Sequence, residues 1–235
     1  MATSGDTTFS VDRDTLIKAS LRLIGVGIID EDPTPTEISN ASEALNMMLK
    51  AWQADGLQLW QIRSYDLTPV AGIYQYNLGA ANVGERPLRI IEAYRRETST
   101  VIDVPLTRLS REEYYKLSDK NTQGTPSNYY FDPQLTNSVL NVWPAPDSDF
   151  ASNSTIHLLY HKPIDDMDAS TNDFEIPQEW YEAVKYGLAV RLAPEYGLGL
   201  QTRRFLKFEA DEIKEKVLDW DTEDASIFFQ PERMR

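Results

Sequence analysis

Residues 34–55 read TPTEISNASEALNMMLKAWQAD and carry the most complete helix signal in the chain. Thr34 is a suitable N-cap, Pro35 fits the first helical position, and Glu37 completes a capping box with Thr34. The apolar residues that follow recur every three or four positions, at Ile38, Ala41, Leu45, Met48, Leu49 and Trp52. The stretch therefore predicts a helix over 35–55 with one buried stripe.

Three further segments have helical spacing. Residues 11–24 precede this helix and end at Gly25, which suits a left-handed helix stop, so we expect an antiparallel hairpin. Near the other end, one helix follows Pro177 and ends at Pro194, and another covers about 199–221. The residues predicted to point inward from the last helix are Leu206, Ala210, Ile213, Val217 and Trp220.

Between these helix pairs the apolar period changes to two, as in strands with two different faces. The candidate strands are near 59–68, 73–78, 87–95, 100–106, 128–132, 138–143 and 154–161. One short helix, starting at a second capping box of Ser110 and Glu113, interrupts the series, and 144–149 reads as a loop. Antiparallel connections fit this order better than parallel crossovers.

Each helix pair has a single apolar stripe and cannot bury it alone. We therefore predict an α+β protein in which the N- and C-terminal pairs, within 1–57 and 177–221, form a four-helix bundle. An antiparallel β domain, a sandwich or barrel-like, is inserted at 58–176. Residues 222–235 lose the helical pattern and are expected to form an extended C-terminal tail.

Composition excludes several classes of function. The 235 residues hold 23 Lys and Arg against 37 Asp and Glu, a net charge of −14, with no cysteine. Disulfides, thiol nucleophiles and Cys-ligated metals are thus impossible, and an acidic chain disfavours tight binding of nucleic acid. The longest uncharged apolar run, 23–29, is far below the roughly 20 residues of a membrane helix, so no membrane contact is expected.

The residues that catalysis or metal binding would need are sparse. His157 and His161 lie four apart on a predicted strand, too far from each other to share an ion, and read as ordinary polar-face histidines. The acidic cluster Asp165, Asp166 and Asp168 lacks the rest of an EF-hand and reads as a solvated loop. We therefore predict no catalytic, metal-binding or cofactor-binding residue.

Two sets of residues suit contacts with other proteins. Lys and Arg are scattered except for Arg203, Arg204 and Lys207, near the start of the last helix. In the tail, Ile227, Phe228 and Phe229 follow an acidic stretch and are too few to form a core. Apolar residues on an extended segment are typical of a partner site that orders on binding; the alternative is that they pack on their own bundle.

Four stretches together resemble a known family: DTLIKASLRLIG at 14–25, EALNMMLKAW at 43–52, WPAPD at 143–147 and IPQEWYEAVKYGLAVRLAPEYG at 176–197. Their content and order, with a β insertion between helix pairs, resemble the head-to-tail adaptors of short-tailed bacteriophages, called tail tubular protein A or tail accessory factor. The resemblance extends over nearly the whole chain.

The resemblance implies a non-enzymatic virion protein of the tail or neck, assembled in the host cytoplasm. Such adaptors form a ring, usually of twelve copies, that docks beneath the portal protein, extends the DNA channel and mounts the tail nozzle, with tail fibre or spike proteins as further partners. DNA would pass without specific binding, and no cofactor is implied. Carried onto this chain, the residues expected to contact the portal or a neighbouring subunit are Ile227, Phe228, Phe229, Arg233 and Arg235.

Two alternatives from other classes remain at this point. A carboxylate-based glycan hydrolase would need two carboxylates roughly 5–10 Å apart in a cleft. A glycan-binding module of a tail would need a pocket lined by Tyr74, Tyr76, Tyr129 or Tyr130, whereas burial of those rings in a core would count against it.

Overall fold

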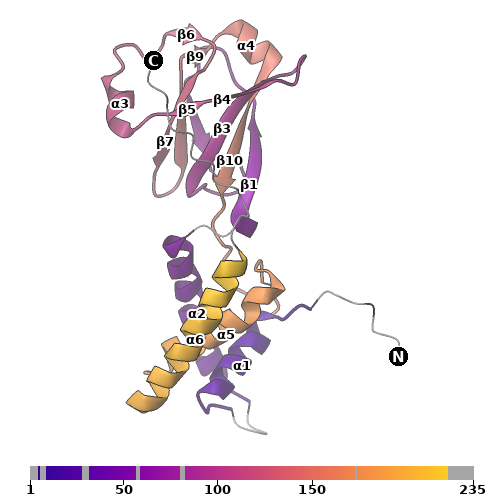
Figure 1. Cartoon of the computed structure of the whole chain (residues 1–235), viewed down its shortest axis with the longest axis vertical. Helices are drawn as coiled ribbons and strands as arrows, with labels where there is room; N and C mark the ends of the chain where they lie inside the picture. The colour runs from indigo at the N-terminus through magenta and orange to yellow at the C-terminus, as the bar shows by residue number, and fades with distance from the viewer. Residues whose placement is uncertain are drawn as a thin grey trace, which may run out of the picture. The chain divides into compact units, whose positions relative to one another are not determined.

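The computed structural model describes residues 5, 9–27, 32–56, 59–79, 83–172 and 174–221. This part of the chain contains six α-helices and three small sheets, which confirms the predicted α+β class. Two compact units make up the chain, a helical unit of residues 1–60 with 164–235 and a β unit of residues 61–163 (Figure 1). The predicted tail contacts, Ile227, Phe228, Phe229, Arg233 and Arg235, lie outside the described residues.

The helical unit is built from α1 (Arg13–Leu23), α2 (Pro35–Asp55), α5 (Tyr181–Leu192) and α6 (Leu200–Trp220). Two 3-10 turns, η1 (Leu59–Gln61) and η2 (Gln178–Trp180), follow α2 and precede α5. The capping box of α2 is present: Thr34 donates its N–H to Glu37 Oε2 at 2.7 Å, and Glu37 returns its N–H to Thr34 Oγ1 at 3.3 Å. Among the described helices, none is both long and apolar enough to cross a membrane.

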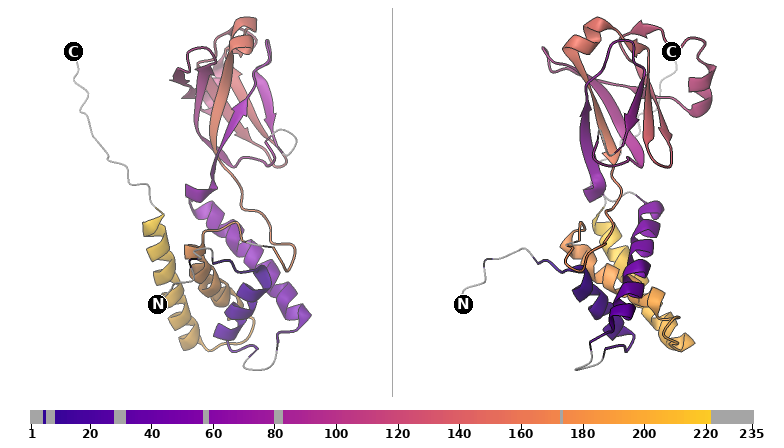
Figure 2. Two further views of the ribbon diagram at one scale, coloured as in Figure 1. Left: turned by 90° about the vertical axis from the view of Figure 1, so that its right-hand side faces the viewer. Right: turned by 180° about the vertical axis from the view of Figure 1, so that it is seen from behind.

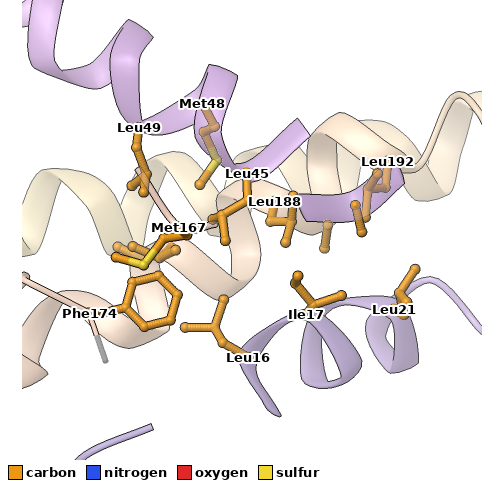
Figure 3. Close-up of a cluster of buried hydrophobic side chains, with 14 of the residues drawn as sticks. Leu16, Ile17, Leu21, Leu45, Met48, Leu49, Met167, Phe174, Leu188 and Leu192 are labelled. Atoms are coloured by element: carbon orange, nitrogen blue, oxygen red, sulfur yellow. The ribbon is translucent and has the colours of Figure 1, made fainter. Parts of the chain in front are cut away.

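Helix α5 is the centre of the helical unit, since it packs against α1, α2 and α6. Figure 3 shows how side chains from α1 and α2 meet those of α5 and of the segment before it. The fully buried members of this core include Ile17, Leu21, Leu45, Met48, Leu49, Met167, Leu188 and Leu192. The apolar stripes predicted for the two helix pairs are therefore buried against each other in one core.

Helix α6 differs from the prediction at its end. Leu206 and Ala210 are buried and Ile213 and Val217 are partly buried, as expected, but Trp220 is 66% exposed. The prediction for Trp220 was wrong because the periodicity shows which side of a helix is apolar and not how far its neighbour extends. Helix α6 has 21 residues and α5 has 12, which correspond to lengths of about 31 Å and 18 Å. The apolar stripe of α6 is therefore longer than the helix that covers it.

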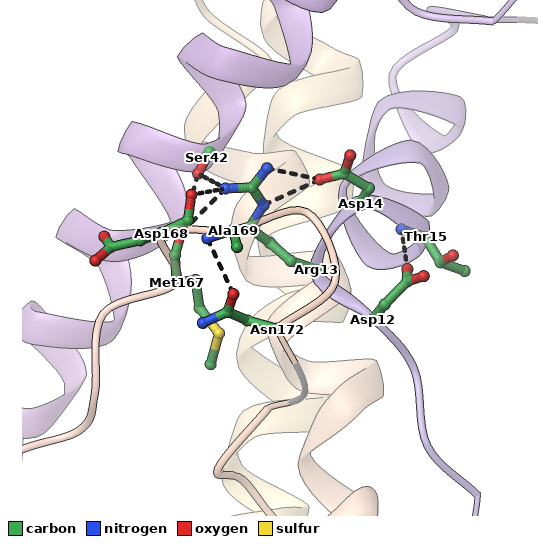
Figure 4. A network of polar contacts seen from close by, with 9 residues as sticks. All are labelled: Asp12, Arg13, Asp14, Thr15, Ser42, Met167, Asp168, Ala169 and Asn172. Atoms are coloured by element: carbon green, nitrogen blue, oxygen red, sulfur yellow. Dashed lines mark hydrogen bonds and ion pairs between the residues drawn. The ribbon is translucent and has the colours of Figure 1, made fainter.

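The segment that returns the chain to the helical unit packs through its apolar residues. Ile164, Met167, Phe174 and Ile176 are buried in the helical core, while Asp165, Asp166 and Asp168 are exposed, as predicted for a solvated loop. Figure 4 shows Arg13 of α1 in the bend of this segment. One nitrogen of its guanidinium donates to the carbonyls of Met167, at 3.1 Å, and Asp168, at 2.9 Å, and to Ser42 Oγ of α2, at 3.2 Å.

The β unit has two four-stranded sheets. The strands are β1 (Ile62–Leu67), β2 (Gln75–Leu78), β3 (Arg89–Glu97), β4 (Asp103–Pro105), β5 (Thr107–Arg108), β6 (Gln123–Gly124), β7 (Asn128–Pro133), β8 (Ser138–Trp143), β9 (Ala145–Pro146) and β10 (Ser154–His161). One sheet has the order β1-β10-β3-β4 and the other β2-β8-β7-β5, and both contribute to a single core (Figure 2). That core includes Leu78, Ile90, Leu140, Val142, Ile156 and Leu158.

Short elements are where the β unit departs from the prediction. All seven predicted strands are present, but β5 pairs with β7, and β6 with β9, in parallel over two residues each. Helix α3 (Arg111–Lys116) begins at the predicted capping box of Ser110 and Glu113. Helix α4 (Ser148–Asn153) was missed: its N-cap Asp147, which accepts from Phe150 N–H at 2.8 Å, lies within the segment read as a loop.

Candidate functional site

The outer face of α6 is the most apolar exposed helix face in the described chain. Leu206 and Ala210 face the core, and this orientation turns Phe205 and Phe208 outward, where they are 63% and 65% exposed. Two residues three apart lie side by side on a helix, so the two rings form one patch. Exposed aromatic pairs are uncommon on monomeric surfaces and are typical of protein-binding sites.

The charges along α6 run against the helix dipole. Its first nine residues, 200–208, contain Arg203, Arg204 and Lys207 and no acid, whereas 209–221 contains six acids and two lysines. A helix favours acidic residues at its N-terminus and basic residues at its C-terminus, by about 0.3–1 kcal/mol each. The first turn has no acid, the last turn has no base, and the N-cap Gly199 supplies no side chain. The positive half of α6 is therefore poorly compensated within its own helix.

A shallow acidic groove lies between α2 and α5. It has a volume of about 370 Å³ and is lined by Asn40, Glu43, Ala44, Met47, Arg191 and Glu195. The α2 residues are spaced three and four apart, so they form one stripe, and Met47 in this stripe is 53% exposed. The neighbouring Tyr196 has a raised pKa, caused first by burial and then by the charges of Glu37 and Glu195. The groove thus combines an apolar residue with local negative charge.

The β unit exposes a second apolar feature at the β3–β4 hairpin. Val101, Ile102 and Val104 are 66%, 59% and 37% exposed, and β4 is an edge strand. Arg96 of β3 holds Asp103 of β4 through two hydrogen bonds of 2.6 Å. This pairing raises the pKa of Arg96 and lowers the pKa of Asp103. The hairpin is therefore an ordered projection with apolar side chains.

The two histidines share a face of β10, as predicted, but neither is solvated. His157 and His161 are 9% and 3% exposed. His157 Nδ1 pairs with Asp66 of β1, and its ring stacks on Tyr94 of β3 with centroids 5.0 Å apart. The prediction of polar-face histidines said nothing about exposure, and the structure adds that this part of the face is buried.

His157 Nε2 also lies 2.8 Å from Thr155 Oγ1, which gives the connectivity of a hydroxyl–His–Asp triad. A triad acts on an acyl group only beside donors that stabilise an oxyanion. Strand β10 is central and pairs with both β1 and β3, so its backbone N–H groups are used in the ladders. The rings of Tyr94 and His157 are nearly parallel, with 13° between their planes, as in side chains stacked across two strands. We therefore interpret Thr155, His157 and Asp66 as a packed structural cluster and not as a catalytic triad.

The described residues do not form the metal site or the tyrosine-lined pocket that other functions would need. Within the described residues, no group of three or more His, Asp or Glu is placed to hold a metal ion. Tyr76, Tyr129 and Tyr130 are 9%, 3% and 5% exposed, and Tyr130 stacks on Tyr114 with centroids 4.9 Å apart. Burial of these rings counts against a tyrosine-lined glycan pocket.

Sequence reasoning missed the exposed apolar residues of α6 and α2 that form these surfaces. Phe205 and Phe208 fall outside the inward stripe of α6, and Met47 falls outside that of α2. The available signal was an apolar residue at a position that the helical period turns outward. Only the basic cluster of Arg203, Arg204 and Lys207 was noticed beforehand, without its aromatic neighbours.

These surfaces define an α+β protein whose exposed apolar side chains suit contacts with other proteins. Comparison with protein families identifies the family: the model of the SU10 adaptor protein family matches residues 12–233. The chain belongs to the SU10 adaptor protein family and is a phage adaptor protein. A search of curated proteins found no match. The predicted resemblance to phage head-to-tail adaptors and the predicted absence of enzymatic activity are confirmed.

Proposed function

We propose that this adaptor forms a ring of identical subunits, twelve in number, beneath the portal protein of a phage. The ring extends the DNA channel and mounts the tail nozzle, and tail fibre or spike proteins are further partners. The observation that carries the proposal is the family match over 12–233, nearly the whole chain. The protein would then reside in the tail or neck of the virion after assembly in the host cytoplasm.

The division of the chain into two units supports separate roles for them. In the helical unit, α5 packs against the other three helices, which is compatible with a four-helix bundle. The same unit presents the exposed face of α6. The β unit has its own core and the exposed hairpin of Val101, Ile102 and Val104. We assign ring formation and portal contact to the helical unit, and contact with the nozzle or fibres to loops of the β unit.

The charge of the chain supports a channel role. A net charge of −14 repels phosphate, so DNA would slide past acidic walls without being held. Positive charge on α6 is concentrated at Arg203, Arg204 and Lys207, beside exposed phenylalanines. That combination suits an acidic, partly apolar protein surface.

For the C-terminal residues the support is their sequence alone. Ile227, Phe228 and Phe229 supply apolar groups, and Arg233 and Arg235 supply positive charge, on a segment that follows an acidic stretch. We propose that they contact the portal or a neighbouring subunit. The family match includes the first four of these five residues.

The test is the mass of the protein with and without its portal. Purified full-length chain should sediment as a monomer or weak oligomer, and addition of portal protein from the same phage should give a complex with a ring of adaptor subunits. A chain that binds neither portal nor portal-containing capsids at any concentration would contradict the proposal. Particle images of the complex would give the number of subunits directly.

A further inference from the structure

Two faces of the helical unit complement each other in both charge and polarity. The first, here the α6 face, consists of Phe205 and Phe208 with Arg204 and Lys207. The second, here the α2–α5 groove, contains Met47 and Ala44 with two carboxylates, Glu43 and Glu195, against one cation, Arg191. We infer that the α6 face of one subunit docks in the α2–α5 groove of a second copy of this chain. The inference rests on the proposed ring and names the surfaces that would hold it together.

The two faces lie on different sides of one subunit, as a ring requires. Helices α6 and α2 both pack against α5, and the left view of Figure 2 shows α6 in yellow and α2 in purple on either side of it. A ring needs a heterologous contact, in which one surface meets a different surface of the next subunit. Each subunit can then offer its α6 face to one neighbour and its groove to the other.

Charge complementarity favours a second copy as the occupant. The α6 face carries positive charge at the helix end where a helix dipole disfavours it, and the first turn has no acid of its own. Carboxylates of Glu43 and Glu195 in the neighbour's groove would supply the missing negative charge. Both glutamates are exposed, and together they outnumber the one cation of the groove, Arg191, so the groove can offer negative charge to a partner.

The apolar groups match as well. Met47 is 53% exposed and lies in the groove, where an adaptable thioether side chain can contact an aromatic ring. Phe205 and Phe208 together would cover Met47 and Ala44, while the charged residues surround them. An apolar centre with a charged rim is the usual composition of a stable protein interface.

Charge reversal with rescue tests the pairing in the full-length protein with portal. Lys207→Glu or Glu43→Lys alone places like charges together, and each should raise the concentration needed for ring formation at least tenfold. The double variant K207E/E43K restores opposite charges across every contact and should assemble at nearly the wild-type concentration. Lys216→Glu is the matched control, because it makes the same charge change on the exposed acidic half of α6 and should assemble normally.

Crosslinking locates the contact directly, because the chain contains no cysteine. A mixture of Phe208→Cys and Met47→Cys proteins, assembled on portal, should give covalent dimers with a short bismaleimide. The variant with both substitutions should give a ladder up to the whole ring. Phe208→Cys mixed with Glu182→Cys, an exposed position at the end of α5 opposite to the groove, should give none.

The outcomes separate this inference from the proposed function. Rings that form without a crosslink between positions 47 and 208, or a K207E/E43K variant that stays unassembled, would overturn the pairing and leave the adaptor ring in place. Wild-type protein that never forms a ring with portal would overturn the proposed function and this inference with it. Crosslinking together with charge rescue would establish the contact.

Discussion

Gly187 of α5 lies directly against the indole of Trp52 of α2: a Cβ atom at position 187 would lie 2.7 Å from Trp52 Cζ2. The same atom would lie 3.0 Å from Met48 Sδ. The absence of a side chain at this position therefore sets how closely α2 approaches α5. In sequence, Gly187 reads only as a small member of an apolar stripe.

We expect Gly187→Ala to destabilise the helical unit. Alanine favours a helix by about 1 kcal/mol over glycine, but overpacking of a close contact costs about 1–3 kcal/mol. The net loss should appear as a lower midpoint in chemical denaturation. Adding Trp52→Phe should recover part of the loss, and Glu182→Ala on the exposed side of α5 should change little. Equal or greater stability of Gly187→Ala would show that α2 and α5 have room to move apart.

Arg13 makes a second, polar link within the helical unit. Its side chain is 11% exposed, and its guanidinium joins α1 to two carbonyls of the returning segment and to Ser42. Arg13→Met would leave those carbonyls without their donor, and we expect a loss of about 1–3 kcal/mol in the free energy of unfolding. Faster proteolysis within 164–172 in the variant than in the wild type would show that the destabilised part is the returning segment. Lys18→Met, which removes only the exposed pair with Asp32, should cost less than about 1 kcal/mol.

Removal of 227–235 separates folding from docking. Within the described chain, the two cores are built from residues no later than Val217, so we expect the truncated protein to unfold at the wild-type midpoint. If the proposal for the C-terminal residues holds, the truncated chain should lose binding to portal in sedimentation. Replacing Ile227, Phe228 and Phe229 together with Ser should have the same effect. Unchanged binding would remove these residues from the proposed contact.

Local signals made most of the secondary structure predictable. The capping boxes Thr34–Glu37 and Ser110–Glu113 use residues three apart, so the sequence alone contains the whole interaction. The parallel pairs β5–β7 and β6–β9 span only two residues and depend on tertiary placement, which periodicity does not describe. The exposure of Trp220 likewise depends on the relative lengths of α5 and α6.

The candidate site was harder to predict than the fold. The Arg203, Arg204 and Lys207 cluster was visible as charge, but its meaning depends on the outward orientation of Phe205 and Phe208. The α2–α5 groove joins residues about 150 positions apart, Glu43 and Arg191 among them, and no local pattern connects them. Such a surface follows from packing, so it became evident only once the helices were in place.

The β3–β4 hairpin contains a backbone strain that a substitution can relieve. Val101 has φ 53°, a left-handed conformation that costs a β-branched residue about 1–2 kcal/mol. Val101→Gly should therefore raise the stability of the β unit by about 1 kcal/mol or less, since glycine also loses more entropy on folding. Thermal unfolding followed by tyrosine absorbance would measure it. Ile102→Gly, at a neighbouring exposed position without positive φ, should lower the melting temperature, and the same gain from both would refute strain as the cause.

His161 predicts how stability depends on mildly acidic pH. Burial lowers its pKa, the charge of Arg89 lowers it further, and its Nε2 is buried without a hydrogen-bond partner among the described residues. The unfolded chain therefore takes up a proton near pH 6.5 while the folded chain still resists it, so the free energy of unfolding must fall as pH drops below 6.5. The slope contributed by His161 cannot exceed about 1.4 kcal/mol per pH unit. Denaturation midpoints measured between about pH 7.5 and 5.5 would show this fall in stability, because carboxylates titrate mainly below that range. His161→Gln should flatten the profile by the His161 contribution, whereas an unchanged slope would mean that the ring is protonated as readily in the folded protein as in the unfolded chain.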